Sequence, residues 1–220
     1  MKTPEKTEDT YYASRYVWNN DRTVVWKEIV RFLKPWLQED QTILDIGAGY
    51  CDFINNVIAD EKIALDYSPE LTKYAGENIE TIISPVTDMS KIAGNTVNVV
   101  FASNLFEHLT DVELALTMSE VKRVLKKEGK LILMQPNYRL SYKTYFDDPT
   151  HKKVFSDEAL RAFLESFGFI VIFKRPRFLP FSLKSRPSVL PLSAWIVRLY
   201  LNLPWKPFAG QMLFVGKKKD

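Results

Sequence analysis

Two glycines that directly follow an apolar run are the first residues in this chain whose spacing could hold a ligand. Gly47 and Gly49 come after the run 42–46, which has the composition of a buried strand. Because glycine has no Cβ, such a turn lets the backbone approach a bound molecule closely. A dinucleotide-binding turn would carry a third glycine at position 52, but Asp52 stands there, and its carboxylate would repel a pyrophosphate. The turn therefore favours a cofactor with positive charge and no phosphate.

Acidic residues near the ends of the next two apolar runs could bind a nucleoside. Asp66 ends the run 62–66, where a carboxylate can accept hydrogen bonds from both hydroxyls of a ribose, and Tyr67 beside it offers a ring to a purine. Asp88 can accept a hydrogen bond from an adenine amino group, with Met89 donating to a ring nitrogen through its backbone. Each acid alone could equally be a cap or a turn residue. Taken together they predict a ribose, an adenine and a cationic tail.

The elements that must position these residues alternate along the chain. Strands are expected at 42–46, 62–66, 79–84, 96–103, 130–136, 169–174 and 211–217. Helices are expected from a cap at Asp21 to about Trp36, at 51–59, at 68–75, from Leu114 through Leu125 to a stop before Gly129, and at 156–168. This alternation predicts a mostly parallel sheet with helices on both faces, and ligands in such sheets lie beyond the carboxyl ends of the strands.

Several segments, taken in order, resemble the motifs of class I S-adenosylmethionine-dependent methyltransferases. They are "LDIGAG", "ALDYSPE", "VTDMS", "VNVVFASNLFEHL" and "EVKRVLKKEGKLILMQPN", and the resemblance covers roughly residues 40–173. It implies an α/β fold with a Rossmann-like, doubly wound sheet of seven strands, mostly parallel with the last strand antiparallel, in three αβα layers. It also implies a single methyltransferase domain over 1–220.

The resemblance also implies a role for each motif residue. The methionine part of S-adenosylmethionine would be held by Asp45, Gly47, Ala48 and Gly49, the ribose by Asp66, and the adenine by Asp88 and Met89. Ser103 and Asn104 would line the pocket beneath the sulfonium. The family often has a third glycine where this chain has Cys51; a thiol there would narrow the turn without necessarily blocking the cofactor.

The only two histidines of the chain, His108 and His151, are candidates for the catalytic base. Methyl transfer to oxygen or to a protonated nitrogen needs a base with a pKa near the working pH, and the resemblance supports histidines in loops of this kind. Alternatively, His108 only packs near the pocket and His151 lies on a surface loop. Some quinone-pathway methyltransferases bind a divalent ion through Glu-x-x-Glu-His. Here Asn104 replaces the first carboxylate, so no metal is expected.

Two regions outside the motifs suggest contacts with ligands or partners. In the N-terminal part, 1–38, an aromatic arm precedes a cap helix; Tyr12 or Tyr16 could shield the cofactor pocket, and Arg15 could pair with a carboxylate. The proline-rich segment 175–208 is inserted between the last two strands. It could cover the pocket, form a homodimer surface, or make peripheral contact with a membrane through its aromatic and basic residues. A lipid-linked acceptor would then be plausible.

Composition narrows the classes that remain. An apolar fraction of 46% supports a proper core, and a net charge of +3 with a pI near 8.8 does not argue for nucleic acid. The N-terminus has no apolar signal core and no run of 18 apolar residues occurs, so a cytoplasmic protein is expected.

The sequence as a whole predicts a methyltransferase acting on a small-molecule or glycan-type acceptor, most simply at oxygen. The polar and aromatic loop 137–155 would shape the acceptor site. Two rival hypotheses are a cofactor-binding partner subunit without catalytic activity and, disfavoured by Asp52, a nicotinamide-dependent dehydrogenase.

Overall fold

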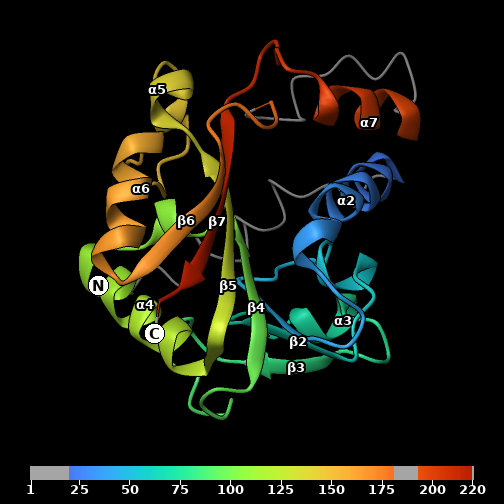
Figure 1. Cartoon of the computed structure of the whole chain (residues 1–220), viewed down its shortest axis with the longest axis vertical. Coiled ribbons are helices and arrows are strands. Elements are labelled where there is room, and N and C mark those ends of the chain that lie inside the picture. The colour runs from blue at the N-terminus through green and yellow to red at the C-terminus, as the bar shows by residue number, and fades with distance from the viewer. Residues whose placement is uncertain (1–19, 181–192, 220) are drawn as a thin grey trace, which may run out of the picture.

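The computed structural model describes residues 20–180 and 193–219, and its centre is a seven-stranded sheet in the order β3-β2-β1-β4-β5-β7-β6 (Figure 1). The strands are β1 (Thr42–Ile46), β2 (Glu61–Asp66), β3 (Glu80–Ile83), β4 (Val97–Ser103), β5 (Leu125–Pro136), β6 (Phe169–Arg175) and β7 (Gln211–Lys218). β1 to β5 pair in parallel, whereas β7 runs antiparallel to both β5 and β6. The expected sheet with an antiparallel last strand is confirmed.

Helices cover both faces of the sheet. The α-helices are α2 (Asn20–Leu33), α3 (Leu71–Tyr74), α4 (Asp111–Val124), α5 (Tyr138–Ser141), α6 (Asp157–Ser166) and α7 (Ala194–Asn202). The short 3₁₀ turns are η1 (Lys34–Trp36), η2 (Ile54–Asn56), η3 (Phe106–His108) and η4 (Tyr145–Asp147). Helices α4 and α6 lie on one face, and α2, α3 and α7 lie on the other, which gives the expected three layers (Figure 1).

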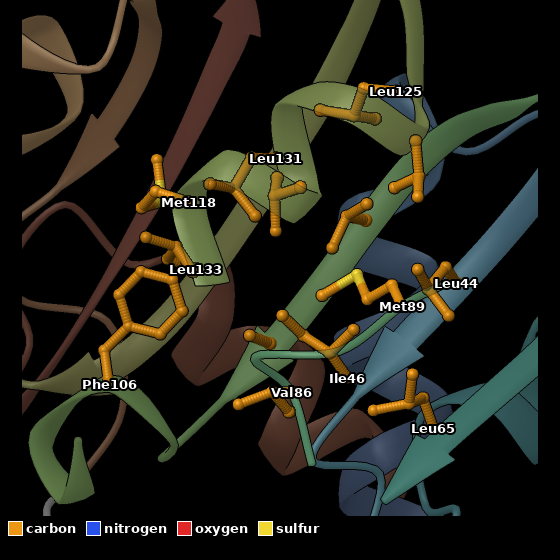
Figure 2. Packing of buried hydrophobic residues seen from close by; sticks show 14 of the residues in the cluster. Leu44, Ile46, Leu65, Val86, Met89, Phe106, Met118, Leu125, Leu131 and Leu133 are labelled. Atoms are coloured by element: carbon orange, nitrogen blue, oxygen red, sulfur yellow. The ribbon is translucent and has the colours of Figure 1, made fainter. Parts of the chain in front are cut away.

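Each face of the sheet has its own hydrophobic core. In β1, Leu44 and Ile46 pack under α4 and α6, as part of the cluster shown in Figure 2, while Ile43 packs under α2. Side chains of a strand alternate between the two faces, and β4 and β5 divide their apolar residues in the same way. Double coverage is therefore the reason why these strands are apolar at nearly every position.

Parallel pairing brings the carboxyl ends of β1, β2 and β4 to one edge of the sheet. Asp45 lies in register with Ala64 of β2 and with Phe101 of β4. The ends of these three strands, together with the loops that follow them, contain most of the residues expected to bind a ligand. The order in which the strands pair thus assembles segments that are far apart in sequence.

Three expected helices differ from the structure. Only η2 forms within 51–59, because Cys51 has a left-handed backbone (φ +57°) and the Asn56 amide donates to the carbonyl of Asp52. The helix after β2 begins at Leu71 rather than at Pro69. Helix α4, capped by Thr110 and Glu113, ends before Leu125, which pairs in the sheet with Val97 instead.

The described part of the inserted segment packs against the N-terminal helix. Arg198 of α7 donates two hydrogen bonds of 2.8 Å to the buried carboxylate of Glu28 in α2. This guanidinium holds the pKa of Glu28 below its ordinary value. Residues 181–192 of the insertion lie outside the described residues. None of the helices in the described parts of the chain is long and apolar enough to cross a membrane.

Candidate functional site

The loop after β1 has a backbone shape that leaves room at one glycine. Gly47, Gly49 and Cys51 all have left-handed conformations, with φ of +64°, +50° and +57°. A Cβ on Gly47 would come within 2.9 Å of Leu105, whereas a Cβ on Gly49 would meet no atom of the described residues within 4 Å. A side chain at 47 would therefore have to displace the end of the Leu105 side chain and would strain the left-handed backbone, whereas the backbone at 49 faces space that a ligand can occupy.

Asp66 is hydrogen-bonded directly to this loop. Its carboxylate accepts a 2.9 Å hydrogen bond from the backbone N–H of Gly49 and another of 2.9 Å from that of Ser68. Each carboxylate oxygen has a second lone pair, so hydroxyl groups of a ligand could still donate to it. The side chain is buried, and burial raises its pKa. The structure thus brings together Gly49 and Asp66, two of the residues expected at the site.

Asp45, Asp52 and Asp66 concentrate acidic groups beneath the loop. Burial, then the charge of Asp66, raises the pKa of Asp45 well above its ordinary value, although the backbone N–H of Ile54 donates to it. The same burial and the same acids raise the pKa of the Cys51 thiol to about 12, so it stays protonated. A bound cationic group would favour ionisation of these carboxyls and would be attracted to them.

Replacing Asp45 with asparagine is expected to stabilise the ligand-free protein at pH 8 but not at pH 4. The folded-state pKa of Asp45 is raised above its unfolded value of about 3.9. Its stability contribution is therefore full below about pH 4 and is lost as the pH rises toward the folded pKa. Asparagine does not titrate and can still accept from Ile54. Thermal unfolding of both proteins at the two pH values measures the difference in their stability. A stability gain of the asparagine variant that does not grow with pH would contradict the prediction.

Asp52, which was expected to repel a pyrophosphate, forms an ion pair in the structure. Arg22 of α2 donates to its carboxylate through Nη2 and, at 3.2 Å, through Nε. This ion pair compensates the charge, so repulsion of a pyrophosphate by Asp52 is weaker than expected. A different feature disfavours a dinucleotide: only the three-residue η2 follows the loop, whereas pyrophosphate sites use the N-terminus of a longer helix.

The adenine-binding role expected for Met89 does not fit its contacts. Its backbone N–H donates to Glu120 at 2.8 Å, and its side chain packs in the core beside Leu44 and Ile46 (Figure 2). Asp88 remains at the surface, where its carboxylate accepts from the Ser90 N–H at 3.0 Å. Hydrogen bonds from the Ser90 hydroxyl, and then from this N–H, lower the pKa of Asp88. Of this pair, only Asp88 can present a hydrogen-bonding group to a ligand.

The remaining expected cofactor residues lie after β2 and β4. Tyr67 is half-exposed beside Asp66, with 54% of its surface accessible. Asn104 has a left-handed backbone (φ +50°), donates to the Ser103 hydroxyl at 3.1 Å and accepts from Gln211 at 3.0 Å. This polar pair thus connects the end of β4 to the first residue of β7. Tyr16, with Tyr12 and Arg15, lies outside the described residues.

The two histidines, from different loops, lie side by side. The ring centroids of His108 in η3 and His151 after β5 are 4.9 Å apart. Nδ1 of His108 lies 3.3 Å from the Thr150 carbonyl oxygen and 3.0 Å from the Thr150 hydroxyl, and Nδ1 of His151 lies 2.6 Å from the Tyr145 carbonyl oxygen. The pairing of these residues could not be derived from their positions in the sequence.

Glu107, the second carboxylate position of the incomplete Glu-x-x-Glu-His pattern, lies beside the two histidines. One ligand atom from each of Glu107, His108 and His151 lies within 4.8 Å of the others. Glu107 is 1% exposed, its Oε2 has no hydrogen-bond partner among the described residues, and burial raises its pKa to about 8. The dipeptide Glu107-His108 was visible in the sequence, but it gave no indication that His151, from another loop, would lie beside it.

The two loops of this cluster are fixed to each other through their backbones. The N–H groups of Lys152 and Lys153 donate to the Glu107 carbonyl oxygen at 2.8 and 3.1 Å. Tyr145 donates its hydroxyl to the Lys153 carbonyl oxygen at 2.5 Å, and its ring lies 4.4 Å from that of His151. The long loop 137–155 is therefore held against η3 by hydrogen bonds and ring contacts.

Part of the chain matches a known protein family. Residues 44–133 match a family described as a methyltransferase domain. An uncharacterised protein of Methanocaldococcus jannaschii is 26% identical over 198 residues, which cover 89% of this chain and 82% of the relative.

Solved structures share the fold at low sequence identity. A S-adenosylmethionine-dependent methyltransferase from Archaeoglobus fulgidus superposes with a TM-score of 0.67 at 20% identity, covering 90% of this chain and 94% of that one. A chain from the complex of the Haloferax volcanii Trm112 methyltransferase activator with a methyltransferase gives 0.69 at 16% identity, covering 96% of each. At these identities the likeness establishes the fold.

Proposed function

Because the chain carries a class I, S-adenosylmethionine-dependent methyltransferase domain, we propose that it transfers a methyl group to a small-molecule or glycan-type acceptor, at an oxygen atom. The observation that carries this proposal is the pair of histidines beside the carboxyl end of β4. They lie at the same edge of the sheet as Gly49 and Asp66, which are joined by a hydrogen bond. A cofactor site and a candidate base on one edge are what a methyl transfer to oxygen requires.

The acidic loop supports binding of the cofactor. S-adenosylmethionine has a positive sulfonium and an α-ammonium group, and Asp45 and Asp66 are buried acids that such charges would favour. The open space at Gly49 leaves room for close approach to the backbone. Asp66 would accept from the ribose hydroxyls, Asp88 would accept from the adenine amino group, and Tyr67, Ala48, Ser103 and Asn104 would line the rest of the site.

The histidine pair supports transfer to a hydroxyl. The sulfonium is already a good leaving group, so this chain's residues mainly have to align the acceptor, exclude water and take its proton. His108 or His151 would accept that proton at Nε2, because in the neutral ring with Nδ1–H pointing at a carbonyl oxygen the lone pair is on Nε2. Exposed Tyr142 and Phe146 in the loop 137–155 would contact the acceptor, and a mixture of polar and aromatic groups suits a sugar.

The described part of the segment 175–208 supports a contact surface as well. Trp195, Trp205 and Phe208 are 65%, 72% and 91% exposed. Aromatic side chains of this kind suit a lipid-linked acceptor, a membrane surface or a second copy of the chain.

Incubating the protein with methyl-labelled S-adenosylmethionine and fractionated cell extract tests the proposal. We expect the label in a small-molecule or glycan fraction, as an alkali-stable methyl ether. Label in protein or nucleic acid would contradict the acceptor class. Cofactor binding without transfer to any fraction would instead favour a partner subunit without catalytic activity.

A further inference from the structure

We propose that Glu107, His108 and His151 form a binding site for a divalent transition-metal ion. The cluster offers two imidazole nitrogens and one carboxylate oxygen, and these atoms lie within 4.8 Å of one another. Two imidazoles and a carboxylate are a donor set that binds Zn²⁺ and related ions and leaves a coordination position open. Hard cations such as Mg²⁺ prefer oxygen donors only, so they fit this set less well.

The surroundings of the two rings match those of metal-binding histidines. In each ring Nδ1 is within hydrogen-bond distance of a backbone carbonyl oxygen, from Thr150 for His108 and from Tyr145 for His151. Metal-binding imidazoles usually donate their other N–H to such an acceptor, which fixes the ring orientation and the tautomer. That tautomer carries its lone pair on Nε2, the atom that would bind the ion. For His151 this nitrogen lies 3.6 Å from Oδ2 of Asp148, so an ion bound there would also face a second carboxylate.

Glu107 provides an independent observation that a ligand is needed. Only 1% of Glu107 is exposed, and its Oε2 has no hydrogen-bond partner among the residues that the structure describes. A buried carboxyl oxygen without a partner is costly, and a cation beside Oε2 would remove that cost. The neighbouring lysines do not supply the charge, because the ammonium groups of Lys152 and Lys153 lie against Glu113 and Asp111 on the surface.

The spacing of the donors is compatible with binding after a small closure. Bonds of about 2.1 Å to a tetrahedral ion place ligand atoms about 3.4 Å apart. The donors are spread over as much as 4.8 Å, so the donor atoms must approach one another by up to about 1.4 Å when the ion binds. The backbone can stay fixed, because Lys152 and Lys153 already tie the two loops together through the Glu107 carbonyl.

This inference goes beyond the proposed function and does not depend on it. The ion and the proton compete for the same imidazole nitrogens. An occupied site would therefore make His108 and His151 ligands rather than bases, and the ion would lower the pKa of an acceptor hydroxyl bound at its open position. Binding can be measured without knowing the acceptor.

Titration of the tag-free, chelator-treated protein with Co²⁺ tests the site. His108 and His151 are the only histidines of the chain, so imidazole coordination must come from this cluster once any histidine tag is removed. We expect visible d–d absorption that saturates at one Co²⁺ per chain and disappears when Zn²⁺ is added. The near-ultraviolet band of a cobalt thiolate should be absent, because Cys51 is buried and its pKa is raised to about 12.

Three variants make the result specific. Glu107→Gln and His151→Ala should each weaken Co²⁺ binding by at least about tenfold. The matched control Glu165→Gln, at an exposed residue paired with Arg161, should bind like the wild type. Glu107→Gln should fold, because the amide has the shape of the protonated carboxyl. Absence of saturable binding, or equal binding by Glu107→Gln and wild type, would overturn the proposal and leave the methyl-transfer proposal intact.

Discussion

Replacing His108 and His151 by alanine, one at a time, is expected to lower the rate of methyl transfer by about 10²- to 10⁴-fold in at least one variant, with affinity for S-adenosylmethionine kept. The two rings lie 4.9 Å apart, and each is oriented through Nδ1 by a neighbouring carbonyl oxygen. Removing the ring that contacts the acceptor takes away the proton acceptor, or a ligand of the ion that would replace it. The carboxylate of Asp66 is oriented by the N–H groups of Gly49 and Ser68, within the loops after β1 and β2, so cofactor binding should persist.

The measurement is the initial rate of label transfer, with calorimetry of cofactor binding on the same preparations. Phe155→Leu, a conservative change in the nearby core, serves as a control for loosened packing of the loop. Full activity in both alanine variants would mean that neither histidine takes the proton. Loss of cofactor binding together with activity would mean that these residues act by holding the fold.

Replacing Asp66 by alanine is expected to weaken S-adenosylmethionine binding by at least about 10²-fold. The carboxylate would accept hydrogen bonds from two ribose hydroxyls, and hydrogen bonds to charged groups contribute about 1.5–3 kcal/mol each. The same side chain orients the loop through the N–H of Gly49 and accepts from that of Ser68. Its loss therefore removes contacts with the ligand and also leaves two donors of the loop without their acceptor.

Isothermal titration of the variant with S-adenosylmethionine measures this loss. Asp60→Ala is the matched control, because Asp60 is an exposed aspartate just before the same strand. Thermal unfolding shows whether the variant is folded. A folded Asp66→Ala protein that binds the cofactor as tightly as the control would remove the ribose-binding role from Asp66.

The central part of the fold could be predicted because its signals are local. Runs such as 96–103 are apolar at nearly every position, since both faces of β4 are covered. Helix α6 was marked by its cap at Ser156 and by Gly168, which has a φ of +80°. The helix expected at 51–59 was wrong although its apolar residues are buried: they pack in the core that contains Val25 and Ile29 of α2, and burial alone does not require a helix.

The site was predictable where one strand and its loop determine a residue's place, and not where distant segments meet. Gly49 and Asp66 follow adjacent strands, so their proximity followed from the expected sheet. The Arg22–Asp52 pair and the Glu107–His151 cluster join separate segments, and no local pattern records such contacts. For Met89 the motif was correctly located, but the N–H is used by Glu120 of α4, and this depends on how the helix packs.

Isothermal titration of the wild-type protein with S-adenosylmethionine, and separately with a nicotinamide dinucleotide, tests the central claim most directly. The acidic loop, the open backbone at Gly49 and the absence of a long helix after the loop in the described chain 20–180 predict saturable binding of S-adenosylmethionine at one molecule per chain. They predict no measurable binding of the dinucleotide. Binding of the dinucleotide, or no binding of S-adenosylmethionine by the folded protein, would contradict this account.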